Sequence, residues 1–308
     1  MKKFLRAFSA SLCVALAACS GESKGTENTG AGGAGGTPAT NTAVVRFTAI
    51  PNQNQTELAQ KFQPVADYLA QTLGVKVEYV PSPDYSASVE LFKNGQVHLA
   101  WLGGLTGVQA RAAVAGAEVI ACGGDDPNYK SYFIANPASG LTPSDTFPMA
   151  LEGKTFTFGS ESSTSGRLMP EHFITLNTGK TPEQFFGAPN KYSGSHDKTW
   201  EQVQNGSVMA GALDFKTYDR DLAAGKIDPA KCFILWTTPS YPDYGWNAHP
   251  ELETLLGAGG VAKVKAALLA MKDPALLAAI NRPEGLISAS NADFEVLAGL
   301  ARNLGLLR

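Results

Sequence analysis

Short apolar stretches alternate with longer helix-like stretches along most of this chain of 308 residues. The apolar stretches are rich in β-branched and aromatic side chains, which is typical of buried strands. The predicted strands cover 44–50, 75–80, 99–102, 119–121, 132–135, 154–158, 208–213 and 233–237, and the predicted helices cover 57–72, 87–93, 107–115, 167–177, 198–204, 216–224 and all of 251–308. This alternation predicts an α/β protein in which parallel-rich sheets carry helices on both faces.

The alternation forms two series, and the length of the chain leaves room for two lobes. We expect lobe 1 to contain residues 43–138 and 240–308, and lobe 2 to contain residues 139–239. The chain would cross between the lobes near Asn136–Ser139 and return near Pro239–Asp243.

Two similar segments, 88–97 and 199–208, support this division. Each is a helix-like stretch that ends in Asn-Gly and is followed by a strand-like stretch. A glycine after the last turn accepts the left-handed conformation that ends a helix. We expect the same helix–strand unit once in each lobe. Chance similarity is the alternative, because such joints are common in α/β proteins.

The N-terminus has the pattern of a processing signal. Lys2, Lys3 and Arg6 precede a mostly apolar run over 7–18, which is too short to span a bilayer and ends just before Cys19. This order predicts a signal peptide over residues 1–18, cleavage before Cys19, and a lipid on that cysteine. The mature chain would then lie on the periplasmic or cell-surface side, anchored to a membrane. An ordinary secretory peptide is the alternative.

Residues 19–42 are rich in glycine and contain no core-forming run, so we expect a flexible tether. Removal of residues 1–18 lowers the number of Lys and Arg from 25 to 22 against 28 Asp and Glu, which changes the net charge from −3 to −6. This acidic balance argues against nucleic acid as a partner. An anionic ligand would have to be held by local dipoles, because the global field opposes it.

Common catalytic and metal motifs are absent from the sequence. It contains no nucleophile elbow, no Cys-x-x-Cys and no His-Glu-x-x-His, and its Gly-Lys-Thr triplets lack the upstream glycine of a phosphate loop. We therefore expect neither a cofactor nor a metal. Cys122 and Cys232 are the cysteines of the mature body, and we expect two separate buried thiols, although the compartment permits a disulfide.

A hydroxyl-rich turn lies between the predicted strand at 154–158 and the predicted helix at 167–177. Five of the six residues in 160–165 are serine or threonine. The first N–H groups of a helix have no partner within it and carry partial positive charge, and hydroxyls add rotatable donors. This combination favours an anion-binding site. The alternative is that one hydroxyl simply caps the helix, but a cap needs only one.

Polar turns also precede the other predicted helices, at 52–56, 82–86 and 193–197. In open α/β sheets such turns gather at the carboxyl ends of the strands, where ligands bind. Two lobes that face each other would bring these turns into one cleft. Polar turns are common, so their number and donor content, rather than any one of them, indicate a small oxyanion ligand.

The chain from about 44 to 250 resembles the periplasmic substrate-binding proteins of phosphonate and phosphite ABC transporters, and most closely their branch described as selenate-binding. The matching segments are Asp84-Tyr85, Trp101-Leu102-Gly103-Gly104, Tyr129, Ser163-Thr164-Ser165-Gly166 and Gly194-Ser195-His196-Asp197. This resemblance implies a type II periplasmic binding protein fold with the ligand cleft between two lobes. It also implies a monomer that closes by a hinge and docks on an ABC permease in the cytoplasmic membrane.

The resemblance also implies which residues contact a tetrahedral oxyanion. They are Tyr85 and Tyr129 from lobe 1, Ser163, Thr164, Ser165 and His196 from lobe 2, and, with a looser match, Asp214 and Asp243. Without the resemblance, both tyrosines are as well explained as interface aromatics. His196 and Asp214 are equally well explained as helix caps. Trp101 would form a wall of the cleft.

These features predict the substrate-binding lipoprotein of an importer, with no covalent chemistry. One alternative is an enzyme that acts on phosphoryl or sulfuryl esters, with Ser163 as nucleophile and His196 as base. Another is a sensory module without transport. An ionised carboxylate only accepts hydrogen bonds, so Asp214 in the site would favour a ligand that carries a proton, such as phosphite, a phosphonate or phosphate. If Asp214 caps the helix near Lys216 instead, selenate stays possible.

Overall fold

The computed structural model describes residues 43–307. The predicted signal peptide, the tether and the lipid on Cys19 lie outside the described residues. Within 43–307, no helix combines the length and the apolar character that a membrane span requires.

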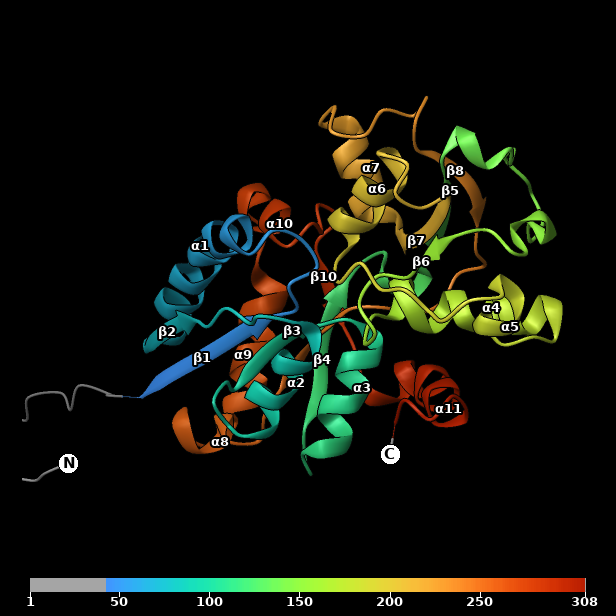
Figure 1. The fold of residues 1–308 in the computed structure, drawn as a ribbon. Helices are drawn as coiled ribbons and strands as arrows, with labels where there is room; N and C mark the ends of the chain where they lie inside the picture. The colour runs from blue at the N-terminus through green and yellow to red at the C-terminus, as the bar shows by residue number, and fades with distance from the viewer. Residues whose placement is uncertain (1–42, 308) are drawn as a thin grey trace, which may run out of the picture. The chain divides into compact units, whose positions relative to one another are not determined.

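The described chain forms two mixed sheets, each flanked by helices (Figure 1). The six-stranded sheet has the order β10-β4-β9-β3-β1-β2, and we call the elements around it lobe 1; the four-stranded sheet has the order β6-β7-β5-β8 and belongs to lobe 2. The strands are β1 (Val44–Ala49), β2 (Lys76–Tyr79), β3 (Leu99–Leu102), β4 (Glu118–Gly123), β5 (Ser131–Ala135), β6 (Phe156–Thr157), β7 (Ala210–Asp214), β8 (Phe233–Thr237), β9 (Gly245–Ala248) and β10 (Leu286–Ser288).

Helices cover both sheets, as Figure 1 shows. Those of lobe 1 are α1 (Gln55–Leu73), α2 (Tyr85–Lys93), α3 (Gly104–Ala113), α8 (Leu252–Leu255), α9 (Gly260–Ala270), α10 (Pro274–Ala279) and α11 (Glu295–Asn303). Those of lobe 2 are α4 (Met169–Thr178), α5 (Pro182–Phe186), α6 (His196–Gln204) and α7 (Phe215–Ala223). Helix α1 packs against β2, α9 and α10, α3 lies between α2 and α11, and α6 and α7 both pack on β7.

Local sequence explains why these elements form. In α1 the buried side chains recur every three or four residues, at Leu58, Phe62, Val65, Ala66 and Leu69. Asn54 caps its first N–H groups, and Gly74 ends it in the left-handed conformation with φ 67°. Every residue of β3 and β7 is buried, which is typical of strands covered on both faces.

Most predicted elements are confirmed. Strands 99–102 and 233–237 have the predicted bounds, and the other predicted elements before residue 240 differ by a few residues at either end. The prediction of an all-helical 251–308 is wrong, because β10 lies within it, and β9 was not predicted. Both strands are short, and β9 becomes a strand because it pairs with β3 and β4 on either side.

The sheets are less parallel than predicted. Among the strand pairs of the described residues, β1–β2, β1–β3 and β6–β7 are parallel, whereas the other five are antiparallel. The antiparallel pairs arise because β5, β9 and β10 enter their sheets from the opposite end. Strand direction of this kind is decided by long-range pairing and leaves little trace in a local pattern.

The first crossing between the lobes lies earlier than predicted. Strand β5 already pairs with β7 and β8, so the chain has entered lobe 2 before Ser131 and not at Asn136–Ser139. The return lies between Thr237 and Gly245, which contains the predicted segment. The two crossing segments pair with each other through Tyr129 and Tyr241, whose backbone groups exchange hydrogen bonds of 2.9 and 3.0 Å.

The repeated helix–strand unit is present in both lobes. Helices α2 and α6 end at Asn94 and Asn205, and the following Gly95 and Gly206 have φ values of 64° and 77°. Each helix leads to a strand that pairs in parallel with an earlier strand, β3 with β1 and β7 with β6. The starts of α2 and α6 therefore occupy equivalent places in the two lobes.

The two described cysteines are free and buried, as predicted. Cys122 lies in β4 of lobe 1, whereas Cys232 precedes β8 of lobe 2. Burial raises the pKa of each thiol to about 12. Both side chains therefore stay protonated at neutral pH and act as small apolar groups.

Candidate functional site

The hydroxyl-rich turn of lobe 2 is held in a tight conformation. Ser163 caps the helix start, because its Oγ accepts a hydrogen bond of 2.9 Å from the N–H of Gly166. A five-residue π-helix over Thr164–Leu168 follows and continues into α4. Gly159 and Gly166 lie so close together that a Cβ on Gly166 would be 3.1 Å from the Cα of Gly159. The glycines therefore permit the turn to fold back on β6.

Other groups of this turn bond to elements outside it. Thr164 Oγ1 accepts a hydrogen bond of 2.9 Å from the N–H of Leu105, at the start of α3 in lobe 1. The carbonyl of Ser165 accepts a bond of 2.7 Å from the Ser131 hydroxyl, which also contacts the Tyr241 hydroxyl. The turn is thus tied to α3, to β5 and, through Ser131, to the returning crossing segment. A hydroxyl that accepts one bond can still donate its own hydrogen. The Thr164 hydroxyl favours the ionised form of Asp243, and the Ser163 hydroxyl lies beside that of Tyr85.

The two predicted tyrosines differ in their partners. The hydroxyl of Tyr85, at the start of α2, lies near the Ser163 hydroxyl but makes no hydrogen bond of good geometry among the described residues. The hydroxyl of Tyr129 donates a bond of 3.0 Å to Asp214 Oδ1. Burial raises the pKa of both phenols well above the ordinary value. Both are therefore neutral donors, and the hydrogen of Tyr85 is available.

His196 begins α6 and links the lobes, because its N–H donates a bond of 3.1 Å to the carbonyl of Asn52. Its ring Nδ1 accepts a bond of 3.4 Å from the N–H of Asp214, which assigns the ring hydrogen to Nε2. Nε2 lies 3.0 Å from Asp214 Oδ2 but is not aligned for a hydrogen bond. Burial lowers the pKa of His196 although the Asp214 carboxylate opposes this. The imidazole is thus neutral, with a buried donor free.

Asp214 caps α7, which was one of the two predicted alternatives. Its Oδ1 accepts from the N–H of Thr217 at 2.7 Å as well as from Tyr129, and its Oδ2 accepts from the Thr217 hydroxyl at 2.8 Å. Burial alone would raise the pKa of Asp214, but His196 and the Thr217 hydrogen bonds hold it below the ordinary value. The carboxylate is therefore ionised and already satisfied by donors of the protein.

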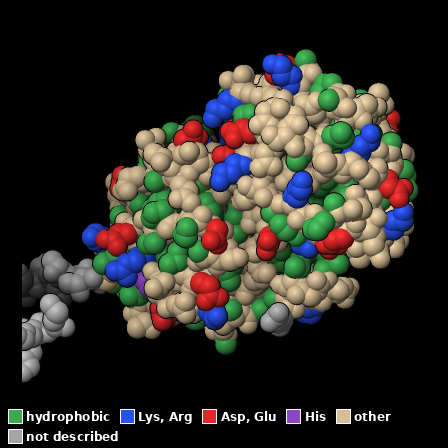
Figure 2. Space-filling model, in the orientation of Figure 1, with side chains coloured by type: hydrophobic (Ala, Val, Ile, Leu, Met, Phe, Trp, Pro, Cys, Tyr) green, Lys and Arg blue, Asp and Glu red, His purple; other side chains and the backbone are tan. Residues whose placement is uncertain are grey.

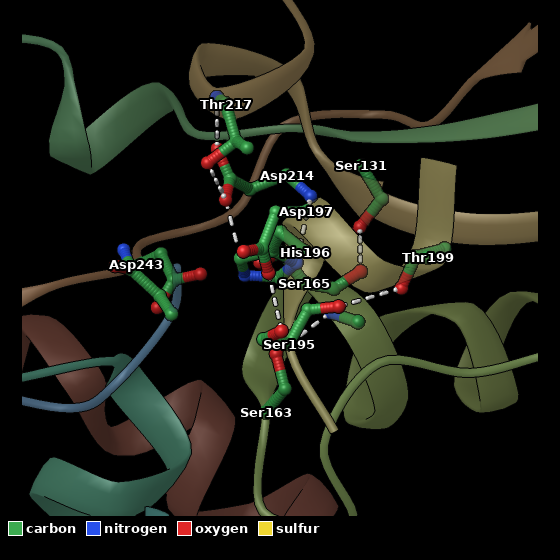
Figure 3. Close-up of polar contacts among 12 residues, drawn as sticks. Ser131, Ser163, Ser165, Ser195, His196, Asp197, Thr199, Asp214, Thr217 and Asp243 are labelled. Atoms are coloured by element: carbon green, nitrogen blue, oxygen red, sulfur yellow. Dashed lines mark hydrogen bonds and ion pairs between the residues drawn. The ribbon is translucent and has the colours of Figure 1, made fainter. Parts of the chain in front are cut away.

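Asp243 has the opposite arrangement. Its Oδ1 accepts hydrogen bonds from the N–H of Gly104 at 2.6 Å and of Tyr244 at 2.9 Å. Its Oδ2 is buried and has no partner among the described residues. In Figure 3 Asp243 lies apart from Ser163 and His196, with one oxygen turned toward them. Burial raises the pKa of Asp243 to about 6.

The structure thus brings the predicted residues into one buried region between the lobes. Each of them is at most 2% exposed, and they come from both lobes and from both crossing segments: Tyr85, Tyr129, Ser163, Thr164, Ser165, His196, Asp214 and Asp243. Figure 3 labels Ser163, Ser165, His196 and Asp214 of lobe 2, with Asp214 joined to Thr217 and Ser131 joined to Ser165. Three buried polar atoms of the predicted residues lack a hydrogen-bond partner among the described residues: the Tyr85 hydroxyl, His196 Nε2 and Asp243 Oδ2.

An aromatic group around a buried arginine was not predicted. The guanidinium of Arg282 lies 4.7 Å from the ring centre of Tyr244, 5.2 Å from Trp101 and 5.5 Å from Tyr129. It also forms an ion pair with Asp126, with Nη2 2.7 Å from Oδ1. A cavity of about 20 Å³, enough for one or two waters, lies against this group. Arg282 belongs to a segment predicted as helix, and no local pattern signals such a contact.

The face of the protein drawn in Figure 2 shows no concentration of positive charge. On the face drawn in Figure 2, Lys and Arg side chains are interspersed with Asp and Glu side chains. Because the net charge of the full chain is −3, an anion in the buried region would be held by local donors.

Two α/β lobes joined by two paired crossing segments, with buried donors between them, define the class of periplasmic binding proteins. The family model described as the periplasmic substrate-binding protein of phosphonate ABC transporters matches residues 47–294. The chain therefore belongs to this family.

Individual relatives agree with this assignment. The chain is 37% identical over 231 residues to the "Probable ABC transporter phosphite binding protein PhnD1" of Prochlorococcus marinus (strain MIT 9301), which covers 74% of this chain and 77% of that protein. It is 30% identical over 244 residues to the "Phosphate-import protein PhnD" of Mycolicibacterium smegmatis, covering 74% and 71%. The names of these relatives refer to phosphite and phosphate, so the narrower similarity to the selenate branch stays a prediction.

Solved structures support the fold. The structure of PhnD1 from Prochlorococcus marinus in complex with methylphosphonate has a TM-score of 0.81 and 33% identity, and covers 86% of this chain and 99% of that chain. A binding protein of an ABC phosphonate transporter from Pseudomonas aeruginosa has a TM-score of 0.73 at 19% identity, and covers 84% and 85%. The second likeness concerns the fold alone.

Proposed function

We propose that this protein binds a small phosphorus oxyanion, such as phosphite or a small phosphonate, between its two lobes and delivers it to an ABC permease. The observation that carries this proposal is the set of buried donors without partners in one region that both lobes enclose. The structural relative at 33% identity is a complex with methylphosphonate, which belongs to the same chemical class.

The donors suit an anion that is held without a salt bridge. Ser163 and Thr164 lie at the start of a helix, where the first N–H groups carry partial positive charge. Tyr85 and His196 would add two neutral donors from α2 and α6. Hydrogen bonds from neutral donors to an anion are strong when water is excluded.

Asp214 would act through its neighbours. Its carboxylate orients the hydroxyl of Tyr129 and caps α7, and its backbone N–H donates to the ring of His196. An ionised carboxylate in contact with an anion would be repulsive, and its oxygens already accept three hydrogen bonds. We therefore assign Asp214 a positioning role, which leaves the choice of oxyanion to other residues.

Closure would occur about the paired crossing segments at Tyr129 and Tyr241, with lobe boundaries before Ser131 and after Thr237. The contacts between lobes, from Asn52 to His196 and from Leu105 to Thr164, are those of a closed form. Opening would break these two bonds and expose the donors to solvent. Hinge closure around a ligand is the usual motion of such proteins.

The membrane anchor is part of the same proposal. A lipid on Cys19, after cleavage of residues 1–18, would hold a monomeric protein near its permease. The order of basic residues, apolar run and cysteine supports this. Cys19→Ser should abolish incorporation of labelled palmitate in cells, and equal labelling of both proteins would contradict the anchor.

An esterase reaction is not favoured by the geometry of the two residues it would need. Nδ1 of His196 accepts from the N–H of Asp214, and Nε2 carries the hydrogen, so neither nitrogen is free to take a proton from Ser163. The Ser163 hydroxyl instead caps the turn. Turnover of a phosphate or sulfate ester that disappears in Ser163→Ala would overturn the transport assignment.

Calorimetry with phosphite, methylphosphonate, phosphate, sulfate and selenate tests the proposal directly. We expect tight binding of at least one phosphorus oxyanion. Ser163→Ala should weaken it by about 1–3 kcal/mol, the cost of leaving a charged acceptor with one donor fewer. Ser144→Ala, at a half-buried serine of lobe 2 outside the candidate site, serves as the control. Absence of binding by all five ions would contradict the proposed function.

A further inference from the structure

The arginines of residues 43–307 divide into two groups by their partners. Four of them form ion pairs with carboxylates: Arg46, Arg167, Arg220 and Arg282. The remaining two of this part of the chain, Arg111 and Arg302, form no ion pair with any described residue. Both line one cavity of about 200 Å³ in lobe 1. Because arginine stays charged at neutral pH, two cations without a counter-charge border the same space.

This cavity lies between α3 and α11, which pack side by side in Figure 1. Arg111 is in the last turn of α3, and Arg302 is in the last turn of α11. By helix geometry, Arg111 lies about 9 Å along α3 from Leu105, whose N–H bonds to Thr164 of lobe 2. None of the residues predicted for the candidate site is among the described residues that line the cavity. The cavity is therefore separate from the region between the lobes.

The surrounding residues fix the position of the Arg111 guanidinium. Its Nη1 donates a hydrogen bond to Oδ1 of Asn247 in β9, and its Cζ lies 5.2 Å from the ring centre of Phe294. The Asn247 amide is itself oriented, because its Nδ2 donates a bond of 2.8 Å to the carbonyl of Gly245. Gly107 lies one turn before Arg111, and a Cβ there would be 3.0 Å from Nη1. A glycine at this position leaves room for the guanidinium against its own helix.

Most donors of this guanidinium remain available. Nε and Nη2 of Arg111 have no hydrogen-bond partner among the described residues. Burial lowers the pKa of Arg111 to about 10, although the Glu295 carboxylate opposes this. The side chain therefore stays charged at neutral pH while it is half-buried. It offers the planar pair of donors that binds two oxygens of a carboxylate or of a tetrahedral oxyanion.

Glu295 is the carboxylate that also lines the cavity. It is exposed, lies in the first turn of α11, and forms no ion pair with Arg111 or Arg302. The charged side chains of the lining are thus two arginines and one glutamate, which leaves one net positive charge. This local excess contrasts with the net charge of −3 of the full chain.

We propose that this cavity is a second anion-binding site, in which Arg111 and Arg302 hold a small free oxyanion such as sulfate, phosphate or a small carboxylate. Arg111 supplies a fork of donors fixed by Asn247 and Phe294. Arg302 supplies a second cation from an exposed position. The bound anion offsets the cost of half-burying a guanidinium without a counter-charge. Because this site lies outside the cleft, it is independent of the proposed function.

The Nε–H resonance of Arg111 reports on the cavity directly, since an anion on that edge of the guanidinium shifts it. Sulfate is titrated into the ¹⁵N-labelled full-length protein while chloride keeps the ionic strength constant, and Arg111→Lys assigns the resonance. We expect a shift that saturates with sulfate and is absent with chloride alone. Sulfate bound only in the cleft would leave this resonance unchanged. An unchanged resonance, or an equal response to chloride, would overturn the proposal.

A variant of the exposed arginine tests the second cation. Arg302→Gln should weaken sulfate binding at the Arg111 resonance by about tenfold, because it removes a charge-assisted hydrogen bond. The free energy of unfolding without sulfate should stay unchanged. Arg46→Gln is the matched control, because Arg46 is a lobe 1 arginine that pairs with Glu78 at 3.2 Å, and it should keep the affinity of the wild type. Equal affinity in Arg302→Gln and Arg46→Gln would contradict the site.

Glu295→Gln distinguishes a bound anion from an internal counter-charge. If the cavity binds sulfate, removal of the opposing carboxylate should strengthen sulfate binding several-fold and leave the stability of the protein without sulfate unchanged. If Glu295 is instead the counter-ion of Arg111 in solution, Glu295→Gln should lower the free energy of unfolding and leave sulfate without effect on the Arg111 resonance of the wild type. That second pattern would overturn the proposal.

Discussion

Asp214 and Asp243 are two buried carboxylates at the same candidate site, and the protein treats them in opposite ways. Asp214, at the end of β7 in lobe 2, accepts hydrogen bonds from Tyr129 and twice from Thr217. Asp243, in the returning crossing segment against lobe 1, satisfies one oxygen and leaves the other without a partner. Their pKa values accordingly shift in opposite directions.

This difference separates a structural from a selective role. A carboxylate whose acceptors are filled by the protein stabilises its own lobe and orients its neighbours. A carboxylate with an oxygen that accepts no hydrogen bond from the protein can accept one from a ligand. Burial alone does not distinguish the two, because both are 1% exposed. The hydrogen bonds of each carboxylate do distinguish them.

The largest effect on stability should come from removing Asp214. Asp214→Ala leaves the Thr217 N–H, the Thr217 hydroxyl and the Tyr129 hydroxyl buried without their acceptor. We expect the free energy of unfolding at pH 7, without ligand, to fall by about 3 kcal/mol, as for other broken buried networks. Chemical denaturation measures this value.

Asp243→Ala is the counterpart in the same experiment. It also removes an acceptor, from Gly104 and Tyr244, but it relieves a buried carboxylate without a counter-charge. The two changes oppose each other, so we expect a loss of about 1 kcal/mol or less. Equal losses in both variants would mean that the two carboxylates do not differ in the way proposed.

The pH dependence of stability should have opposite signs for the two residues. The pKa of Asp214 is lowered in the folded protein, so its contribution is present above the unfolded pKa and is lost as the pH falls. The pKa of Asp243 is raised to about 6, so its contribution is present below the unfolded pKa and is lost as the pH rises toward and through 6. The change amounts to about 2–3 kcal/mol between pH 4 and pH 7.

Difference curves isolate these contributions. Wild type minus Asp243→Asn should decline from pH 4 to pH 7, whereas wild type minus Asp214→Asn should rise over the acid range. Unfolding by denaturant at several pH values without ligand provides both curves. Flat or parallel differences would show that one of the carboxylates titrates as it does in the unfolded chain.

Sequence patterns predicted the architecture well where the signal is local. Helix α1 carries its apolar periodicity and its caps within its own residues, and β3 and β7 are apolar throughout. Strands β9 and β10 escaped prediction because their strand character comes from pairing with distant strands. The early crossing before Ser131 was missed for the same reason, since only the pairing of β5 assigns it to lobe 2.

The candidate site was predicted as a set of residues but not as a set of bonds. The hydroxyl turn signalled donors, and Ser163 both caps the helix and keeps its hydrogen. No local pattern shows that Thr164 bonds to Leu105. Nor does one show that both oxygens of Asp214 accept hydrogen bonds, whereas Oδ2 of Asp243 accepts none of good geometry. These distinctions depend on atoms that meet only after both lobes and both crossing segments have folded.

Tyr129 and Tyr85 differ in the same way as the two carboxylates, because the Tyr129 hydroxyl donates to Asp214 and the Tyr85 hydroxyl makes no hydrogen bond of good geometry. Tyr85→Phe should weaken phosphite binding by about tenfold, or 1.4 kcal/mol, while the free energy of unfolding without ligand stays unchanged. Tyr129→Phe removes a donor from Asp214, so we expect a loss of about 1 kcal/mol in stability and a smaller loss in affinity. Calorimetry and denaturation of both variants separate these outcomes, and a reversed pattern would exchange the two roles.

The smallest effect on phosphite binding should come from ion pairs whose carboxylates are not deeply buried. Lys216 of α7 forms ion pairs across the lobes with Asp125 at 3.0 Å and Glu284 at 3.2 Å. Partly exposed pairs of this kind contribute little, so Lys216→Met should weaken phosphite binding by less than about threefold, and added salt should remove the difference. Lys231→Met is the matched control, because Lys231 pairs with Asp228 at 3.3 Å within lobe 2, where closure does not alter the contact. Titration of both variants with phosphite at low and high ionic strength measures the two effects. A loss of tenfold or more in Lys216→Met, absent from Lys231→Met, would mean that ion pairs between the lobes, rather than the buried donors and Asp243, hold the closed form together.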